Sequence, residues 1–134
     1  MQDRGWWLGA ALSGALVVIA GAFGAHALAG QLEPRLAAAF ETGVRYQAWH
    51  TLGIMGVLAW RAPSPLAGQR LVLGLWASGM LLFSGSLYGM ALSGVRGLGM
   101  VTPVGGLLLI AGWLALAVCV IRARPLDQSA SGST

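Results

Sequence analysis

Long runs without aspartate, glutamate, lysine or arginine constrain this sequence more than any other feature. Four such runs occupy residues 5–32, 46–60, 71–95 and 97–121. A helix needs about 20 predominantly apolar residues to cross the hydrocarbon core of a bilayer. Only 9% of the 134 residues are charged and 57% are hydrophobic, more apolar surface than a soluble domain of this length could bury. The sequence therefore predicts an all-α integral membrane four-helix bundle, with spans at about 6–28, 44–61, 71–93 and 98–121.

The first uncharged run also has features of a secretory signal peptide. Arg4 supplies a basic start, and Ala25-His26-Ala27 fits a small-x-small cleavage pattern. However, the apolar stretch from Trp6 to Leu28 is longer than the usual hydrophobic region of about 7–15 residues, and it is long enough to span a bilayer. We therefore expect a retained first span with His26 near its end.

The second run is too short to span a bilayer alone. Residues 46–60 cover about 22 Å as a helix, against a hydrocarbon core of about 30 Å. Before this run, Leu36, Phe40 and Val44 recur every four residues among charged neighbours, a pattern typical of an interfacial amphipathic helix. The sequence thus predicts a short amphipathic segment before the second span, opened by Pro34 and bent into the span at Gly43.

Glu41 and Arg45 are the charged residues of this segment closest to the span. They stand four residues apart with the acid first, which is the favourable order for an ion pair on one helix face. We predict an interfacial ion pair that faces solvent or lipid headgroups.

The arginines predict the orientation of the bundle. If both termini share one side, that side carries five arginines and the other side three: Arg4, Arg61, Arg70, Arg122 and Arg124 against Arg35, Arg45 and Arg96. The more basic side is normally cytoplasmic. We expect a multi-pass protein of a bacterial-type inner (plasma) membrane with both termini in the cytoplasm. Residues 1–126 would form the four-span domain and residues 127–134 a mobile polar tail.

Hydrogen-bonding side chains concentrate in one half of the predicted bundle. When four spans alternate in direction, the end of the first, the start of the second, the end of the third and the start of the fourth meet at one membrane face. These segments carry a candidate polar cluster: His26, Tyr46, Gln47, His50, Ser84, Ser86, Tyr88 and Thr102. Because the first two spans are adjacent, we expect His26 and His50 to approach within about 10 Å, the spacing of neighbouring helix axes.

Two interpretations of this cluster remain open. In the structural one, the side chains hydrogen-bond neighbouring helices and hold the bundle in register. In the functional one, His26, His50 and Tyr88 line a small outer cavity, because imidazole can bind metals or pass protons near pH 6.5 and ionisable groups within spans are often functional.

Small residues predict close helix packing. The chain contains 21 glycines, well above the average share of about 7%. Gly85, Gly89 and Ser93 recur every four residues, as do Ala10 and Gly14. Such small-xxx-small stripes let membrane helices approach closely, so we predict that both stripes lie at helix contacts.

Five sequence segments, spread over all four predicted spans, resemble a known family. They are GAFGAHAL at 21–28, TGVRYQAWH at 42–50, LFSGSLYGMAL at 82–92, TPVGG at 102–106 and GW at 112–113. Together they are similar to the small membrane-protein family catalogued as domain of unknown function 423, which includes bacterial inner-membrane proteins and the human transmembrane protein 256. The resemblance covers roughly residues 8–118. It implies a four-span membrane protein and no particular activity, cofactor or set of functional residues.

The remaining motifs narrow the functional classes. The sequence contains no nucleophile elbow, Walker loop or H-E-x-x-H motif, and its single Cys119 is expected to be a buried hydrophobe. We therefore expect a non-enzymatic accessory or assembly subunit without a cofactor. Its partners would be the lipid bilayer and a membrane protein or a second copy, with no nucleic acid. The alternative is a binding or passage site for a proton, metal ion or small solute at the polar cluster. A haem or metal enzyme is less favoured, because two histidines underdetermine such a site.

Overall fold

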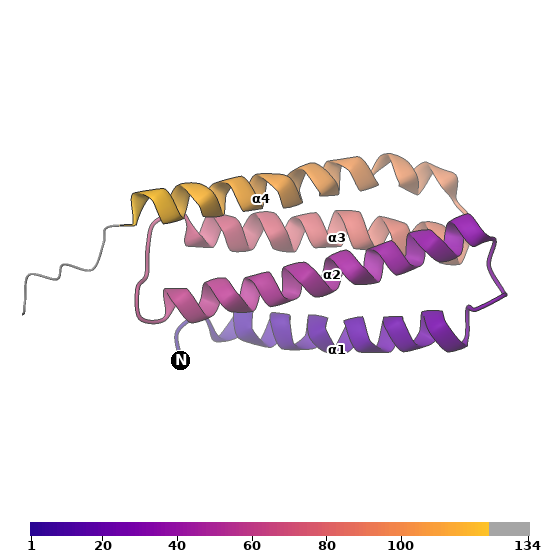
Figure 1. Ribbon diagram of the computed structural model, residues 1–134, viewed down its shortest axis with the longest axis horizontal. Coiled ribbons are helices and arrows are strands. Elements are labelled where there is room, and N and C mark those ends of the chain that lie inside the picture. The colour runs from indigo at the N-terminus through magenta and orange to yellow at the C-terminus, as the bar shows by residue number, and fades with distance from the viewer. Residues whose placement is uncertain (124–134) are drawn as a thin grey trace, which may run out of the picture.

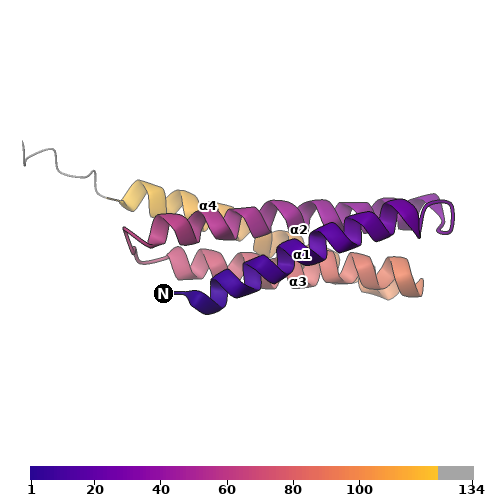
Figure 2. The same cartoon turned by 90° about the horizontal axis from the view of Figure 1, so that it is seen from below.

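Four antiparallel helices form the molecule in a computed structural model that describes residues 1–123. They are α1 (Arg4–His26), α2 (Pro34–Arg61), α3 (Gln69–Ser93) and α4 (Thr102–Arg122), with a short 3₁₀ helix, η1 (Arg96–Met100), before α4. Figures 1 and 2 show the four long helices side by side, with the N-terminus and the α2–α3 loop at the same end. The predicted tail at 127–134 lies outside the described residues.

Three segments are long and apolar enough to cross a membrane by length and composition: α1, α3 and the stretch Arg96–Arg122. Within the described part of the chain, α2 does not belong to this set. Its first turns contain Arg35, Glu41 and Arg45, and polar residues such as Gln47 and His50 follow in its middle. The sequence prediction of four helices is therefore confirmed, and the membrane character of three of them follows from their composition.

Glycine and proline set the helix boundaries. Pro34 opens α2 and Pro103 lies in the first turn of α4, where the missing backbone N–H costs no helical hydrogen bond. Gly94 ends α3 at φ 73° and Gly68 precedes α3 at φ 95°. Both glycines adopt left-handed backbone conformations that other residues rarely take.

The predicted bend at Gly43 is wrong. The helix α2 runs without interruption from Pro34 to Arg61, so the amphipathic turns are the beginning of the same helix and not a separate segment. Gly43 serves close packing instead, since a Cβ atom there would lie 2.8 Å from Cε1 of Tyr88 on α3. The missing side chain makes room for the tyrosine ring.

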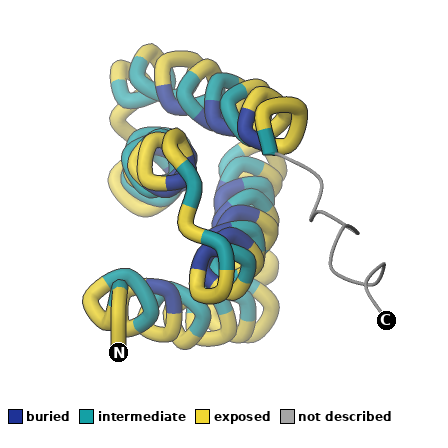
Figure 3. Tube along the Cα trace, turned by 90° about the vertical axis from the view of Figure 1, so that its left-hand side faces the viewer, coloured by how far each residue is buried: buried dark blue, intermediate teal, exposed yellow. Residues whose placement is uncertain are grey.

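The helices pack in chain order, α1 on α2, α2 on α3 and α3 on α4. The core lies around α3, where Trp76, Leu73 and Val72 have no exposed surface. In Figure 3 the buried segments follow α2, α3 and α4, while the α1 tube is mostly exposed or intermediate. Only Ala10 of α1 is buried.

Glycine brings α3 and α4 together, but not the glycines that the sequence indicated. A Cβ atom on Gly79 would meet Leu109, one on Gly112 would meet Trp76, and one on Gly105 would meet the α3 backbone, including the carbonyl carbon of Leu82 at 2.8 Å. These three positions have neighbours that only a hydrogen atom can clear.

The predicted small-residue stripes are mostly outside the helix contacts. Ala10 is buried against the core, whereas a Cβ atom on Gly14 or Gly85 would meet nothing within 4 Å. Gly89 faces Leu98 of η1, and Ser93 is exposed. The spacing shows that these small residues share one side of each helix. It does not show whether another helix packs on that side.

Candidate functional site

Gln47 joins three helices in the interior of the bundle. Its side-chain amide donates hydrogen bonds to the hydroxyl of Ser13 on α1 at 3.1 Å and to the carbonyl of the same residue at 3.3 Å. Its amide oxygen accepts a hydrogen bond of 2.6 Å from the hydroxyl of Tyr88 on α3. The Ser13 hydroxyl also pairs with that of Thr51 at 2.7 Å. The predicted cluster does not include Ser13 or Thr51. Neither residue lies in the span ends that the alternating span directions bring to one membrane face.

His50 forms a second polar contact that links α2 to α4. The residue is 3% exposed. Its Nδ1 lies 2.7 Å from the carbonyl oxygen of Tyr46, and its Nε2 lies 3.0 Å from the indole Nε1 of Trp113. A carbonyl can only accept and an indole N–H can only donate. The two contacts therefore fix the neutral imidazole with its proton on Nδ1.

This pairing limits what His50 can do chemically. Both ring nitrogens are occupied, so a proton or a metal ion would have to displace the Trp113 indole from Nε2. Aromatic rings of Trp76 and Trp113 also flank the imidazole, with centroids 5.8 and 5.9 Å away. Within residues 1–123, no group of three histidine, cysteine or carboxylate side chains is arranged to hold a metal ion. The geometry is that of a helix-to-helix tie.

The other members of the predicted cluster make separate contacts. Ser84 donates a hydrogen bond of 2.7 Å to the carbonyl of Gly43, which ties α3 to α2. The hydroxyls of Ser86 and Thr102 lie 2.6 Å apart and tie α3 to α4. Tyr46 packs its ring on Phe83 with the centroids 4.8 Å apart. The polar side chains thus form several small ties between helices.

His26 does not join the other predicted residues. It is exposed at the end of α1 and makes none of the hydrogen bonds described for residues 1–123. The register explains why, since Ser13 lies beside Gln47 while Gly24 lies beside Phe40. Because α2 extends back to Pro34, the end of α1 meets the start of α2, and His26 lies about 20 Å beyond Ser13 along the helix axis. The expected approach of the two histidines is wrong.

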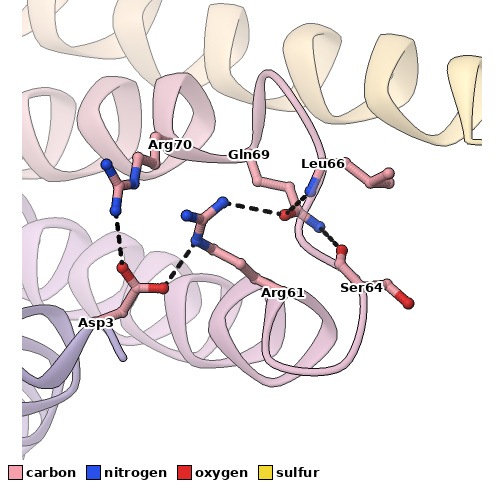
Figure 4. Close-up of polar contacts among 6 residues, drawn as sticks. All are labelled: Asp3, Arg61, Ser64, Leu66, Gln69 and Arg70. Carbon is pink, nitrogen blue, oxygen red and sulfur yellow. Dashed lines mark hydrogen bonds and ion pairs between the residues drawn. The ribbon is translucent and has the colours of Figure 1, made fainter. Parts of the chain in front are cut away.

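A buried ion pair lies at the opposite end of the bundle, and the sequence did not predict it. Asp3 accepts a hydrogen bond of 2.8 Å from Nε of Arg61, and both side chains are 9% exposed. The second carboxylate oxygen of Asp3 lies 3.6 Å from Nη2 of Arg70, whose side chain is 68% exposed. Figure 4 shows Asp3 between the two arginines. The carboxylate therefore joins the start of α1 to the end of α2 and the start of α3.

Gln69 completes this end of the molecule. It is fully buried and accepts hydrogen bonds from Arg61 at 3.5 Å and from the backbone N–H of Leu66 at 2.8 Å, while its amide donates to the carbonyl of Ser64 at 3.3 Å. The α2–α3 loop thus folds around one glutamine (Figure 4). Asp3 and Arg61 are 58 residues apart, and no local spacing rule points to such a pair.

Glu41 and Arg45 form the ion pair that their spacing indicates. The Arg45 guanidinium lies 3.2 Å from the Glu41 carboxylate, and the side chains are 52% and 74% exposed respectively. An exposed pair of this kind contributes little to stability.

A lateral groove separates α1 from α3. It has a volume of about 680 Å³ and is lined by residues of α1, α2 and α3, among them Trp6, Gly9, Leu16, Ile54, Ala77 and Leu81. The groove exists because α1 packs on α2 and does not reach α3. Its lining is almost entirely apolar.

Comparison with known proteins places the chain in a family. The family model described as "Protein of unknown function (DUF423)" matches residues 20–106. The chain belongs to this family. The "UPF0382 inner membrane protein YgdD" of Escherichia coli (strain K12) is 40% identical over 132 residues, which cover 92% of this chain and 95% of the relative.

Two further relatives agree. A "UPF0382 membrane protein" of Haemophilus influenzae is 39% identical over 87% of this chain and 93% of its own length. Another "UPF0382 membrane protein", from Staphylococcus haemolyticus, is 44% identical over 76% of this chain and 83% of its own length. No solved structure matches the chain. The resemblance seen in the sequence is thus confirmed, and the protein is a membrane protein of this family.

Proposed function

We propose that this protein is a non-enzymatic accessory or assembly subunit of the inner membrane, in which all four helices span the bilayer. The helix α2 contains 28 residues, about 42 Å, and lies antiparallel between two membrane-capable helices (Figure 1). Its charged residues lie outside the stretch 46–60, with Arg35, Glu41 and Arg45 before it and Arg61 after it. This distribution supports a fourth span in which the long side chains of Arg45 and Arg61 extend to the two interfaces.

The observation that best supports the accessory role is that α1 contacts one other helix and, within residues 1–123, leaves its remaining surface free of helix contacts. Among the described helices, α1 packs on α2 alone. On the face away from both α2 and the groove, five exposed residues alternate in steps of three and four: Leu8, Ala11, Ala15, Val18 and Ala22. This is the spacing of a left-handed helix pair, and alanine allows the close approach that membrane helices use. We call these five residues the α1 seam.

The outer face of α4 provides the contrast. Its exposed residues are large and aliphatic, including Val104, Leu107, Ile110, Leu114 and Ile121. Large aliphatic side chains suit a surface that faces lipid, whereas small ones are enriched where two membrane helices meet. The difference supports a partner helix on the α1 seam and lipid on α4.

Photocrosslinking tests this proposal. A photoreactive residue at Ala15 should yield a discrete protein adduct in membranes, and the same residue at Leu114 should yield lipid adducts only. An Ala15→Trp substitution should remove the adduct formed from a crosslinker at Ala22, while Leu114→Trp should not. An adduct of twice 13.8 kDa would identify a second copy as the partner. Equal labelling at Ala15 and Leu114 would contradict the proposal.

The proposed orientation places both termini in the cytoplasm. It is supported by the arginines at the end of the bundle that carries the N-terminus, Arg4, Arg61, Arg70 and Arg122. Asp3 offsets one of these charges. Reporter fusions at both termini should read cytoplasmic and a fusion at Arg96 should read periplasmic. A periplasmic C-terminus would contradict both the orientation and the fourth span.

The alternative function, a binding or passage site for a proton, metal ion or small solute, has less support. Its central residue, His50, has both ring nitrogens engaged, and the groove next to Gln47 is apolar. Uptake assays in vesicles that contain the purified protein would test it, with His50→Phe as the variant expected to abolish any flux.

A further inference from the structure

The groove between α1 and α3 is suited to a hydrocarbon chain. Its lining runs from Trp6 to Phe23 on α1, a distance of about 25 Å along the helix, against a hydrocarbon core of about 30 Å. The groove therefore extends across most of the apolar layer.

The few polar residues of the groove do not call for a polar occupant. Gln47 donates a hydrogen bond to Ser13 and accepts one from Tyr88, and Ser84 donates to the carbonyl of Gly43. Within residues 1–123 no buried side-chain nitrogen or oxygen lacks a hydrogen-bond partner. An apolar chain can thus fill the groove without leaving a buried polar atom unpaired.

A cationic group lies at one end of this groove. Arg70 precedes the groove residues Ala77 and Leu81 by seven and eleven residues, so it shares their face of α3. It lies about 10 Å before Ala77 along the helix, toward the end of the bundle that carries the N-terminus. Gly74 lies between them, and a Cβ atom there would meet nothing within 4 Å.

The charge balance at this end is positive. Asp3 is shared by two arginines, and its closer bond goes to Arg61 at 2.8 Å. Among residues 1–123, Arg70 donates no hydrogen bond and makes only the 3.6 Å ion pair with Asp3. Arg4, which follows Asp3 in the chain, is exposed. Trp6 lines the groove near the start of α1, and indole rings are enriched at membrane interfaces.

We propose that the groove binds an anionic glycerophospholipid from the leaflet on the side of the N-terminus, with one acyl chain between α1 and α3 and the phosphate group at Arg70. An arginine guanidinium supplies several N–H donors in a geometry that suits phosphate oxygens. This site is on a different face of α1 from the proposed partner seam, so either proposal can fail alone.

Lipid binding to the purified full chain tests the proposal, with phosphatidylglycerol and phosphatidylcholine as probes and native mass spectrometry as the readout. Wild type should prefer phosphatidylglycerol by about fivefold or more, the effect of one arginine near an anionic headgroup. Arg70→Gln should remove about fivefold of that preference. Arg45→Gln, at the other end of the bundle, should leave it unchanged.

A second pair of variants locates the chain. Gly9 lines the groove and Gly56 does not, and a Cβ atom at either position would meet nothing within 4 Å. Gly9→Leu should reduce binding of both lipids severalfold, because its side chain occupies the groove, while Gly56→Leu should bind as wild type does. Equal affinity of wild type for the two lipids, or unchanged binding by Gly9→Leu, would overturn the proposal.

Discussion

The α3–α4 pair and the helix α1 contain the same kinds of residue but use them differently. Glycines 79, 105 and 112 lie against a leucine, a backbone and a tryptophan of the facing helix. By contrast, a Cβ atom added to the α1 glycines at positions 5, 9 and 14 would meet nothing within 4 Å. Helix association in lipid depends on close packing and on few hydrogen bonds, because burial from lipid brings no hydrophobic gain. A small residue therefore stabilises a bundle only where a complementary surface meets it.

The largest expected effect is at Gly105. Its Gly105→Ala variant would push a methyl group into the α3 backbone near Phe83 and Leu82, and a backbone cannot move aside as a flexible side chain can. We expect a loss of about 3 kcal/mol in the free energy of unfolding, at the upper end of the usual cost of overpacking. Reversible unfolding in mixed micelles would measure it. A loss below about 1 kcal/mol would show that α3 and α4 separate easily.

Asp3 provides the second test, because it is the charged contact that holds the start of α1. Asp3→Asn would leave Arg61 buried without its counter-ion. Breaking a buried pair costs about 3–5 kcal/mol in a protein interior, and we expect about 2 kcal/mol here because the pair lies near the aqueous end of the bundle. The matched control is Glu41→Gln, which removes an exposed pair and should cost less than about 0.5 kcal/mol. Equal effects of the two changes would contradict the burial of Asp3.

These two pairs also show what could be predicted from the sequence. The Glu41–Arg45 pair follows from helical spacing alone, and the four helices follow from the uncharged runs. The Asp3–Arg61 pair depends on the tertiary meeting of residues 58 positions apart, and no pattern in the chain encodes it. Likewise, the sequence indicated a bend at Gly43, because a glycine in a helix has two interpretations, a hinge or a close contact. Only the position of Tyr88 decides between them.

Gln47 is the third test, since it ties α2 to both of its neighbours, α1 and α3, in the interior. Gln47→Leu would remove the hydrogen bonds to Ser13 and leave the Tyr88 hydroxyl without its acceptor. Hydrogen bonds between membrane helices average about 0.6 kcal/mol and reach about 1.7, so we expect a loss of about 1 kcal/mol. As a control, Ser86→Ala removes one tie between α3 and α4, a pair that glycine packing already holds, and should cost less. A larger loss for Ser86→Ala would reverse the comparison.

The candidate site was predictable only in part for the same reason. Alternating span directions predicted a cluster that includes Gln47, His50 and Tyr88, and in the structure all three make contacts between helices. The second span was predicted to begin near residue 44, whereas α2 begins at Pro34. That difference shifts the register between α1 and α2, so His26 lies beyond the cluster and Ser13 takes its place. The start of α2 could not be predicted from the sequence, because the charged residues in its first turns are also typical of an interfacial segment.

The smallest expected effect is at Gly14. This position tests most directly whether anything packs on this side of α1. Gly14→Ala makes the same chemical change as Gly105→Ala, but the new methyl group meets nothing within 4 Å. Alanine is favoured over glycine in a helix interior by roughly 0.5–1 kcal/mol, because the unfolded glycine has more freedom to lose. We expect a gain of about 0.5 kcal/mol in the free energy of unfolding, measured under the conditions used for Gly105→Ala. A loss of 1 kcal/mol or more would mean that a neighbour occupies this side of α1 even in the isolated protein.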